Sequence, residues 1–216
     1  MSSAQPRPLP PGRTVPLPPG RAVPLPPGRA VPLPPGRTLI AGVGNIFLGD
    51  DGFGVETVRA LGAHTLPDGV ELVDAGVRGV HLAYRMLDDY RTVLLVDAAA
   101  RGGEPGSLYL LDATDPADAA ARPENTPLDA HHMTPDAVLA LLDTLSAGTG
   151  AQRPERVLVV GCEPADTEEG IGLSTPVAAA VDEAVRLVLR LVGAQDPAPA
   201  PTGAPTATSE RNTTPC

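Results

Sequence analysis

Acidic side chains stand where short apolar runs of this sequence end, and they are the first candidates for chemistry. Asp97 closes the run TVLLV, and Asp74 closes the run VELV. Asp51 belongs to the glycine-rich stretch GVGNIFLGDDGFG. Carboxylates at the ends of buried strands can face a cleft and serve as acids, bases or metal ligands. Turn or helix-capping roles are the alternative for each, and Asp50 as a helix cap is compatible with Asp51 facing the cleft.

Histidine occurs only four times, and two of the imidazoles are neighbours in the chain. His131 and His132 precede a Thr-Pro pair, which predicts a helix start. One imidazole and two carboxylates, namely His131, Asp51 and Asp97, would suit a divalent first-row metal and leave positions open for water or substrate. From residue types alone, this site is one hypothesis beside ordinary structural roles for the same side chains.

Other catalytic patterns do not occur in the sequence. A G-x-G-x-x-G dinucleotide fingerprint would need glycine at position 47, which is Phe47. The sequence has no G-x-S-x-G elbow, no H-E-x-x-H motif and no P-loop. Ser174 is better explained by the start of a helix. Cys162 directly follows an apolar run, which favours a buried, unreactive thiol.

The elements that must position these acids alternate between strand and helix patterns. Continuous apolar runs predict strands at 38–43, 70–74, 92–97, 107–112 and 156–161. Helical patterns cover 51–64 and 80–89, and the pairs Thr134-Pro135 and Thr175-Pro176 predict two further helix starts. This alternation predicts an α/β fold in three layers, with a twisted, mostly parallel five-stranded sheet between helices. The acids then gather at the carboxyl ends of the strands.

Proline divides the chain into three parts. Residues 1–38 contain 13 of the 27 prolines and repeat PLPPGR every eight residues, at 8–13, 16–21, 24–29 and 32–37. We expect this head, and the tail at 195–216, to be disordered. A repeat expansion explains the head better than a ligand for a proline-binding domain or a spacer does. One domain, residues 39–194, is long enough to bury a core.

Charge and cysteine content exclude several classes of function. Residues 39–194 carry 10 Arg and 24 acidic residues, a charge of −14, within a chain of net charge −10. Such a domain repels phosphate backbones, so we expect no nucleic-acid partner. The two cysteines make no disulfide framework. No apolar run reaches the length of a membrane span and no signal-peptide core is recognisable, so we expect a cytoplasmic monomer without membrane contact.

Five ordered blocks of the sequence resemble one protein family. They are IAGVGNIFLGDDGFGVETV, VDAGVRGVHLAYRM, TVLLVDAA, DAHHMTPDAVLALL and VLVVGCEPADTEEGIGLSTPV, and together they span roughly residues 39–192. In this order and spacing they resemble the NiFe-hydrogenase maturation endopeptidases. The resemblance implies a phosphorylase/hydrolase-like α/β fold. It also implies removal of the C-terminal extension of a hydrogenase large-subunit precursor once nickel has been inserted.

The resemblance also implies roles for particular residues. The metal-binding acids of the family fall on Asp51 and Asp97 and its histidine on His131, with His132 as the neighbouring choice. Asp74 and Gly76 match its D-x-G loop near the same cleft. Nickel would be supplied by the precursor, which is the expected partner. The alternatives are a chaperone-like relative that binds the precursor without cutting it, or a small-ligand-binding α/β protein, which Phe47 disfavours.

Deletion of residues 1–36 tests the division of the chain. We expect the truncated protein to cleave its substrate at the rate of the full chain, because the repeats contribute no residue to the domain's site. Cleavage assays on both proteins measure this, and loss of activity on truncation would contradict it.

Overall fold

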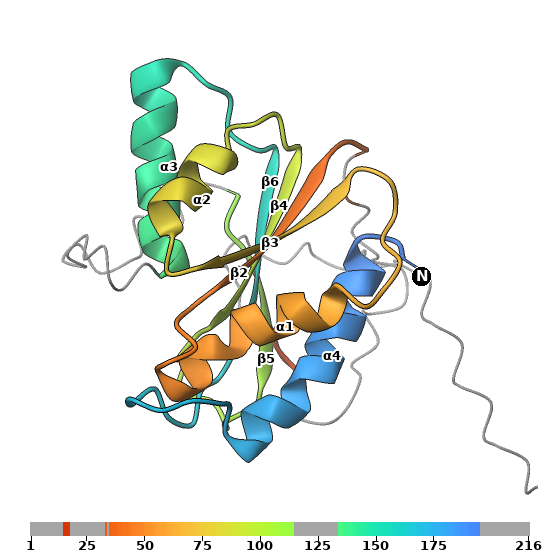
Figure 1. The fold of residues 1–216 in the computed structure, drawn as a ribbon. Helices are drawn as coiled ribbons and strands as arrows, with labels where there is room; N and C mark the ends of the chain where they lie inside the picture. Colours follow the sequence, from red (N-terminus) through yellow and green to blue (C-terminus); the bar gives the residue numbers. More distant parts are fainter. Residues whose placement is uncertain (1–14, 18–32, 34, 115–133, 195–216) are drawn as a thin grey trace, which may run out of the picture.

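A six-stranded sheet forms the middle layer of the molecule (Figure 1). The computed structural model of the chain describes residues 15–17, 33, 35–114 and 134–194. The strands lie side by side in the order β1-β5-β6-β4-β2-β3. Those from β6 to β3 are parallel, whereas β5 runs antiparallel to β6 and β1 antiparallel to β5. Their bounds are β1 Val15–Leu17, β2 Thr38–Val43, β3 Val70–Gly76, β4 Thr92–Ala98, β5 Leu108–Asp112 and β6 Arg156–Cys162.

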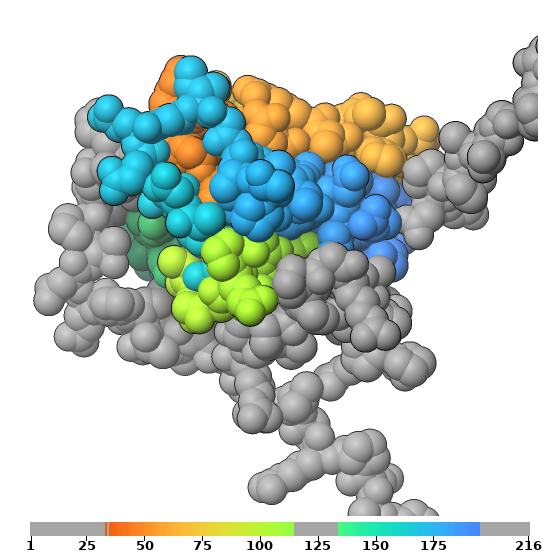
Figure 2. Space-filling view, turned by 90° about the horizontal axis from the view of Figure 1, so that it is seen from below, coloured from red at the N-terminus to blue at the C-terminus, as the bar shows by residue number. Residues whose placement is uncertain are grey.

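Helices cover both faces of this sheet, as Figure 1 shows. A 3-10 helix η1 (Gly49–Gly52) leads into α1 (Phe53–Leu61), which packs beside α4 (Thr175–Leu191) on one face. On the other face α2 (Gly79–Arg85) packs beside α3 (Pro135–Thr149). In Figure 2, α4 in blue lies between α1 in orange and the green segment that contains β5. The predicted three-layer α/β architecture is therefore confirmed. None of the helices in the described residues is long and apolar enough to cross a membrane.

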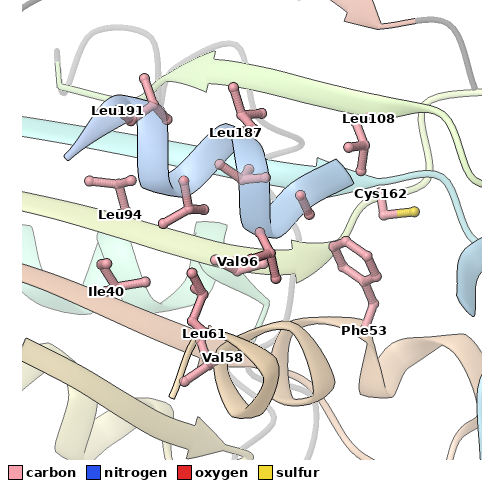
Figure 3. Close-up of a cluster of buried hydrophobic side chains, with 14 of the residues drawn as sticks. Ile40, Phe53, Val58, Leu61, Leu94, Val96, Leu108, Cys162, Leu187 and Leu191 are labelled. Carbon is pink, nitrogen blue, oxygen red and sulfur yellow. The ribbon is translucent and has the colours of Figure 1, made fainter. Parts of the chain in front are cut away.

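Two apolar clusters hold the layers together, one on each side of the sheet. All six residues of β2 are buried, as the uninterrupted apolar runs of a parallel sheet require. In the view of Figure 3, Leu94 and Val96 of β4 lie between Leu187 of α4 and the α1 residues Val58 and Leu61, all of one apolar cluster. Full burial of one such leucine stabilises the fold by roughly 1.5–3 kcal/mol. The alternation of sequence patterns thus produces a sheet buried on both faces.

The Thr-Pro pairs predict one helix start correctly and miss the other by one residue. The Oγ1 atom of Thr134 accepts a hydrogen bond from the amide of Ala137, so Thr134 is the expected N-cap of α3. At α4 the N-cap is Ser174, and the helix already includes Thr175. Ser174 does not cap with its side chain, because its hydroxyl donates to the carboxylate of Asp50 instead. A tertiary contact therefore takes the place of the local cap at this helix.

One short strand lies within the proline-rich head. Val15–Leu17 pairs with β5, from Val15 opposite Leu110 to Leu17 opposite Leu108. The sheet therefore has one more strand than the five expected, because the edge of β5 offers unpaired backbone groups to an extended segment. Thr38, which we assigned to the head, is buried as the first residue of β2. Residues 195–216 lie outside the described part of the chain.

Glu71 forms a charged cluster at the amino ends of the parallel strands, away from the acids singled out above. Its carboxylate contacts Arg37 at 2.6 Å, Tyr90 Oη at 2.6 Å and Arg85 at 3.0 Å. The Arg37 guanidinium also lies 4.3 Å from the centroid of the Tyr90 ring. The hydroxyl of Tyr90 and then Arg37 lower the pKa of Glu71 from 4.5 to about 2. The cluster ties the start of β3 to the residues preceding β2 and β4.

We expect Glu71→Gln to lower the melting temperature at pH 7. The melting temperature of this variant should also change less between pH 7 and pH 3 than that of the wild type. Because the pKa of Glu71 is depressed on folding, its contribution is complete above about pH 4.5 and disappears as the pH falls toward about 2. Circular dichroism melts from pH 7 to pH 3 measure the difference between the two proteins. Glu155→Gln, which removes an exposed ion pair with Arg91, is the control with a smaller expected effect. An unchanged melting profile in Glu71→Gln would contradict the role of the cluster.

Candidate functional site

The carboxyl ends of the parallel strands meet at one edge of the sheet, where the loops after β2 and β3 touch. The amide of Gly44, just after β2, donates to the carbonyl of Gly76 at the end of β3, at 3.2 Å. Gly44 has a φ of 121°, and a Cβ atom on it would lie 1.8 Å from the carbonyl oxygen of Asp51. Only glycine fits there, because any side chain would push η1 away. The glycines of this loop thus let Asp51 fold back onto the end of β2.

Asp51 lies in η1 and is held by the loop itself. Its Oδ2 atom accepts a hydrogen bond from the amide of Asn45 at 2.6 Å. One carboxylate oxygen is therefore bound to the backbone that precedes η1, which fixes the direction of the side chain. The loop that carries Asp51 therefore also sets the orientation of its carboxylate.

Asp97 is the buried acid at the end of β4, with 4% of its surface exposed. Burial raises the pKa of Asp97 well above its ordinary range, and the negative charge of Asp51 raises it further. The charge of Asp136, in the first turn of α3, acts in the same direction. Two carboxylates that disfavour each other's charge would both be stabilised by a cation placed near them. The sheet thus brings together the two acids that the strand ends predicted.

Asp74 and Gly76 lie on a cleft of about 220 Å³ that is also lined by Asn45, whose amide binds the Asp51 carboxylate. Its walls are the residues after β2, which include Phe47, and the residues from Asp74 to Arg78 at the end of β3. The carboxylate of Asp74 lies 3.5 Å from the guanidinium of Arg59. The expected D-x-G loop therefore forms one wall of a cleft whose other wall is the loop that leads to Asp51.

The histidines of the expected metal site, His131 and His132, lie outside the described residues. Among the residues that the structure describes, no group of three or more His, Cys, Asp or Glu side chains could hold a metal ion. The structure brings Asp51 and Asp97 close together, and the metal-binding role of these acids and of an imidazole stays a prediction. The donor set suits nickel in kind, since two carboxylates and one imidazole are ordinary ligands for such a divalent ion.

Asp50 has a role that its sequence context does not predict. We expected this residue to cap a helix, but its side chain caps none, and it is fully buried. Its carboxylate accepts hydrogen bonds from the amides of Ala165, Asp166 and Ser174 and from the Ser174 hydroxyl, at 2.6–3.1 Å. Burial alone raises the pKa of Asp50, but these hydrogen bonds, those of Ser174 first, outweigh it and hold the pKa below its ordinary value. The adjacent acids of the DD pair were the only sequence signal for this arrangement.

Backbone hydrogen bonds extend the contact between the two loops. Gly170 donates to the carbonyl of Phe47 at 2.9 Å and accepts from the amide of Gly49 at 3.0 Å. The amide of Asp50 donates to the carbonyl of Asp166 at 2.9 Å. The loop that carries Asp51 is therefore fixed to the segment between β6 and α4, more than 100 residues away in the chain.

Glu163 is a second acid whose role the sequence did not reveal. Its carboxylate accepts from the hydroxyl of Tyr109 at 2.7 Å and from the amides of Arg101 and Gly102 at 2.8 and 3.0 Å. It thereby holds the loop that follows Asp97.

The residue before Glu163, Cys162, is fully buried, and burial raises the pKa of its thiol to about 12. This confirms the expectation of an unreactive cysteine.

Replacing Asp50 by alanine should destabilise the domain by roughly 2–4 kcal/mol, because several buried donors lose their acceptor. Ser174→Ala removes only one of the hydrogen bonds and should cost about 1 kcal/mol. Urea unfolding followed by circular dichroism measures both values. A free energy of unfolding for Asp50→Ala within ~0.5 kcal/mol of the wild type would show that the loops hold together without this carboxylate.

Comparisons with known proteins agree on one family. The family model described as hydrogenase maturation protease matches residues 55–191. A putative hydrogenase maturation protease of Methanocaldococcus jannaschii is 37% identical over 155 residues, covering 70% of this chain and 93% of the relative. The hydrogenase 2 maturation protease of Escherichia coli is 34% identical, covering 70% and 87%. The solved hydrogenase maturating endopeptidase HybD from E. coli aligns with a TM-score of 0.57 and 33% identity, covering 71% and 90%. The chain therefore belongs to the hydrogenase maturation protease family.

Proposed function

We propose that this protein is an endopeptidase that removes the C-terminal extension of a NiFe-hydrogenase large-subunit precursor after nickel has been inserted. The observation that carries the proposal is the position of Asp51, which the Asn45 amide holds in a loop close enough to the buried Asp97 for its charge to raise the pKa of Asp97. Relatives named as maturation proteases support the reaction class. The precursor is the partner, and we infer that a monomer acts on it in the cytoplasm.

The nickel ion belongs to the substrate in this proposal. Asp51, Asp97 and His131 would contact the nickel already held by the precursor. A divalent ion bound there supplies Lewis-acid chemistry to a nearby water or carbonyl group. The buried position of Asp97 favours such a contact, because an incoming cation offsets both the burial and the charge of Asp51.

The protein's own contribution is the placement of its side chains. Asn45 fixes the direction of the Asp51 carboxylate, and the Asp50 network fixes the loop on which it stands. A carboxylate held in this way contacts the precursor's metal without a large loss of side-chain freedom. Because the nickel belongs to the precursor, Asp51 and Asp97 act only on a precursor that already carries nickel.

Cleavage of a nickel-loaded precursor tests the assignment. Asp51→Asn, Asp97→Asn and His131→Ala should each lower the rate roughly 100-fold or more, because each removes one group that acts directly at the reacting centre. His132→Ala is the control and should keep the wild-type rate. The appearance of the shortened large subunit on denaturing gels measures cleavage, and nickel-free precursor should stay uncut.

Two results would overturn the assignment in different ways. Full activity in both Asp97→Asn and His131→Ala would remove these residues from the site. Stable binding of the nickel-loaded precursor by the wild type without any cleavage would instead favour the chaperone-like alternative. Loss of activity in His132→Ala but not in His131→Ala would move the imidazole ligand by one residue.

A further inference from the structure

Four large apolar side chains are exposed around the cleft and on the helix beyond it. Phe47 is 61% exposed, Val77 45%, Val80 42% and Tyr84 56%. Among the described residues, Ile171 alone joins them as an exposed large hydrophobic side chain. We call these four the apolar strip. Apolar side chains gathered in this way on a protein surface mark a site that contacts another molecule.

The strip begins at the candidate site and follows α2. Phe47 and Val77 line the cleft on which Asp74 and Gly76 lie. Val80 and Tyr84 are four residues apart on α2, so they share one face of that helix, while Leu82 and Ala83 face the core. Four residues of a helix rise about 6 Å. Alternate side chains of an extended peptide are spaced about 6.6 Å apart, so two of them match the spacing of Val80 and Tyr84 along α2.

Arg78 adds a positive charge to the cleft that Phe47 and Val77 line. Its guanidinium donates to the backbone carbonyls of Ala75 at 3.2 Å and Asp74 at 2.5 Å. Among the described residues it forms no ion pair with a carboxylate, whereas Arg59 on the same cleft contacts both Glu56 and Asp74. Residues 39–194 carry a charge of −14, so an acidic group would be repelled by most of the surface and attracted here.

We propose that the apolar strip and Arg78 bind an extended segment of the protein substrate that carries apolar side chains and a carboxylate group. This inference rests on the proposed function, since it assumes that the partner is a polypeptide brought to the adjacent acids. The strip holds the segment through its apolar side chains, and Arg78 pairs with its carboxylate. The segment then enters the cleft between Phe47 and Val77 and continues toward Asp51 and Asp97.

Steady-state cleavage of nickel-loaded precursor by the full chain tests this surface. The double variant Val80→Ser/Tyr84→Ser should raise KM about tenfold and leave kcat within about twofold, because it weakens binding without touching the reacting groups. Arg78→Gln should also raise KM. At higher salt concentration, the difference in KM between this variant and the wild type should become smaller, because salt screens the charge of Arg78. Tyr84→Leu keeps the apolar area and should restore most of the affinity.

Matched controls come from α2 itself and from α4, on the opposite face of the sheet. His81→Ser changes an exposed polar residue of α2, and Arg186→Gln removes a charge on α4; both should keep the wild-type KM. An unchanged KM in the double variant and in Arg78→Gln would overturn the proposal. If the double variant alters the sedimentation coefficient and not KM, the strip is a contact between copies of this chain, which also overturns it.

Binding measured without cleavage separates this proposal from the proposed function. Fluorescence anisotropy of labelled, nickel-loaded precursor gives the affinity of each variant directly. Tight binding by the wild type that is lost in the double variant supports the strip even if no cleavage occurs, in which case the endopeptidase function fails alone. Equal affinity of the wild type and the double variant overturns the binding role of the apolar strip and leaves the endopeptidase function untouched. Melting temperatures of all variants identify any that fail to fold.

Discussion

The hydrogen-bond network around the buried carboxylate of Asp50 is the contact on which the candidate site depends. It joins the loop after β2 to the segment between β6 and α4, and it uses side-chain and backbone donors from both ends of that segment. Asp51 is the next residue in the same 3-10 helix. The position of a candidate ligand therefore follows from a network made by its neighbour, and the start of α4 is set by the same network, because the Ser174 hydroxyl bonds to Asp50.

Charge compensation differs between the two ends of the sheet. Glu71, at the amino ends, is surrounded by Arg37, Arg85 and Tyr90, which lower its pKa. Burial and the negative charges of Asp51 and Asp136 raise the pKa of Asp97, at the carboxyl ends, and a hydrogen bond from the Ala98 amide opposes this rise. Among the described residues, arginines compensate the charge of Glu71, whereas Asp51 and Asp97 form a pair of like charges. Such a pair gains most from a cation that arrives with the substrate.

Much of the fold follows from local patterns in the sequence. The runs TLIAGV and TVLLVD are buried from end to end in β2 and β4, and Thr134 caps α3 as its Thr-Pro pair predicts. These features depend on residues close together in the chain. The same holds for Asp97, since a single acid after a buried apolar run has to lie at the edge of the sheet.

The main features that the sequence did not predict depend on residues far apart in the chain. Asp50 and Glu163 look like turn acids in the sequence, and their donors come from segments about 115 and 60 residues away. The expected cap at Thr175 moved to Ser174 because Ser174 is bound to Asp50. The pairing of Val15–Leu17 with β5 likewise needs the assembled sheet edge. Local patterns predict elements, whereas contacts between loops appear only when the strands have brought them together.

The central claim is that Asp51, Asp97 and His131 contact nickel held by the precursor. X-ray absorption at the nickel edge tests it most directly, on nickel-loaded precursor alone and after mixing with the wild type or with Asp97→Ala. We expect the wild type to add oxygen or nitrogen ligands to the nickel spectrum, and Asp97→Ala to add fewer. A nickel spectrum that does not change when the wild-type protein binds would contradict the claim.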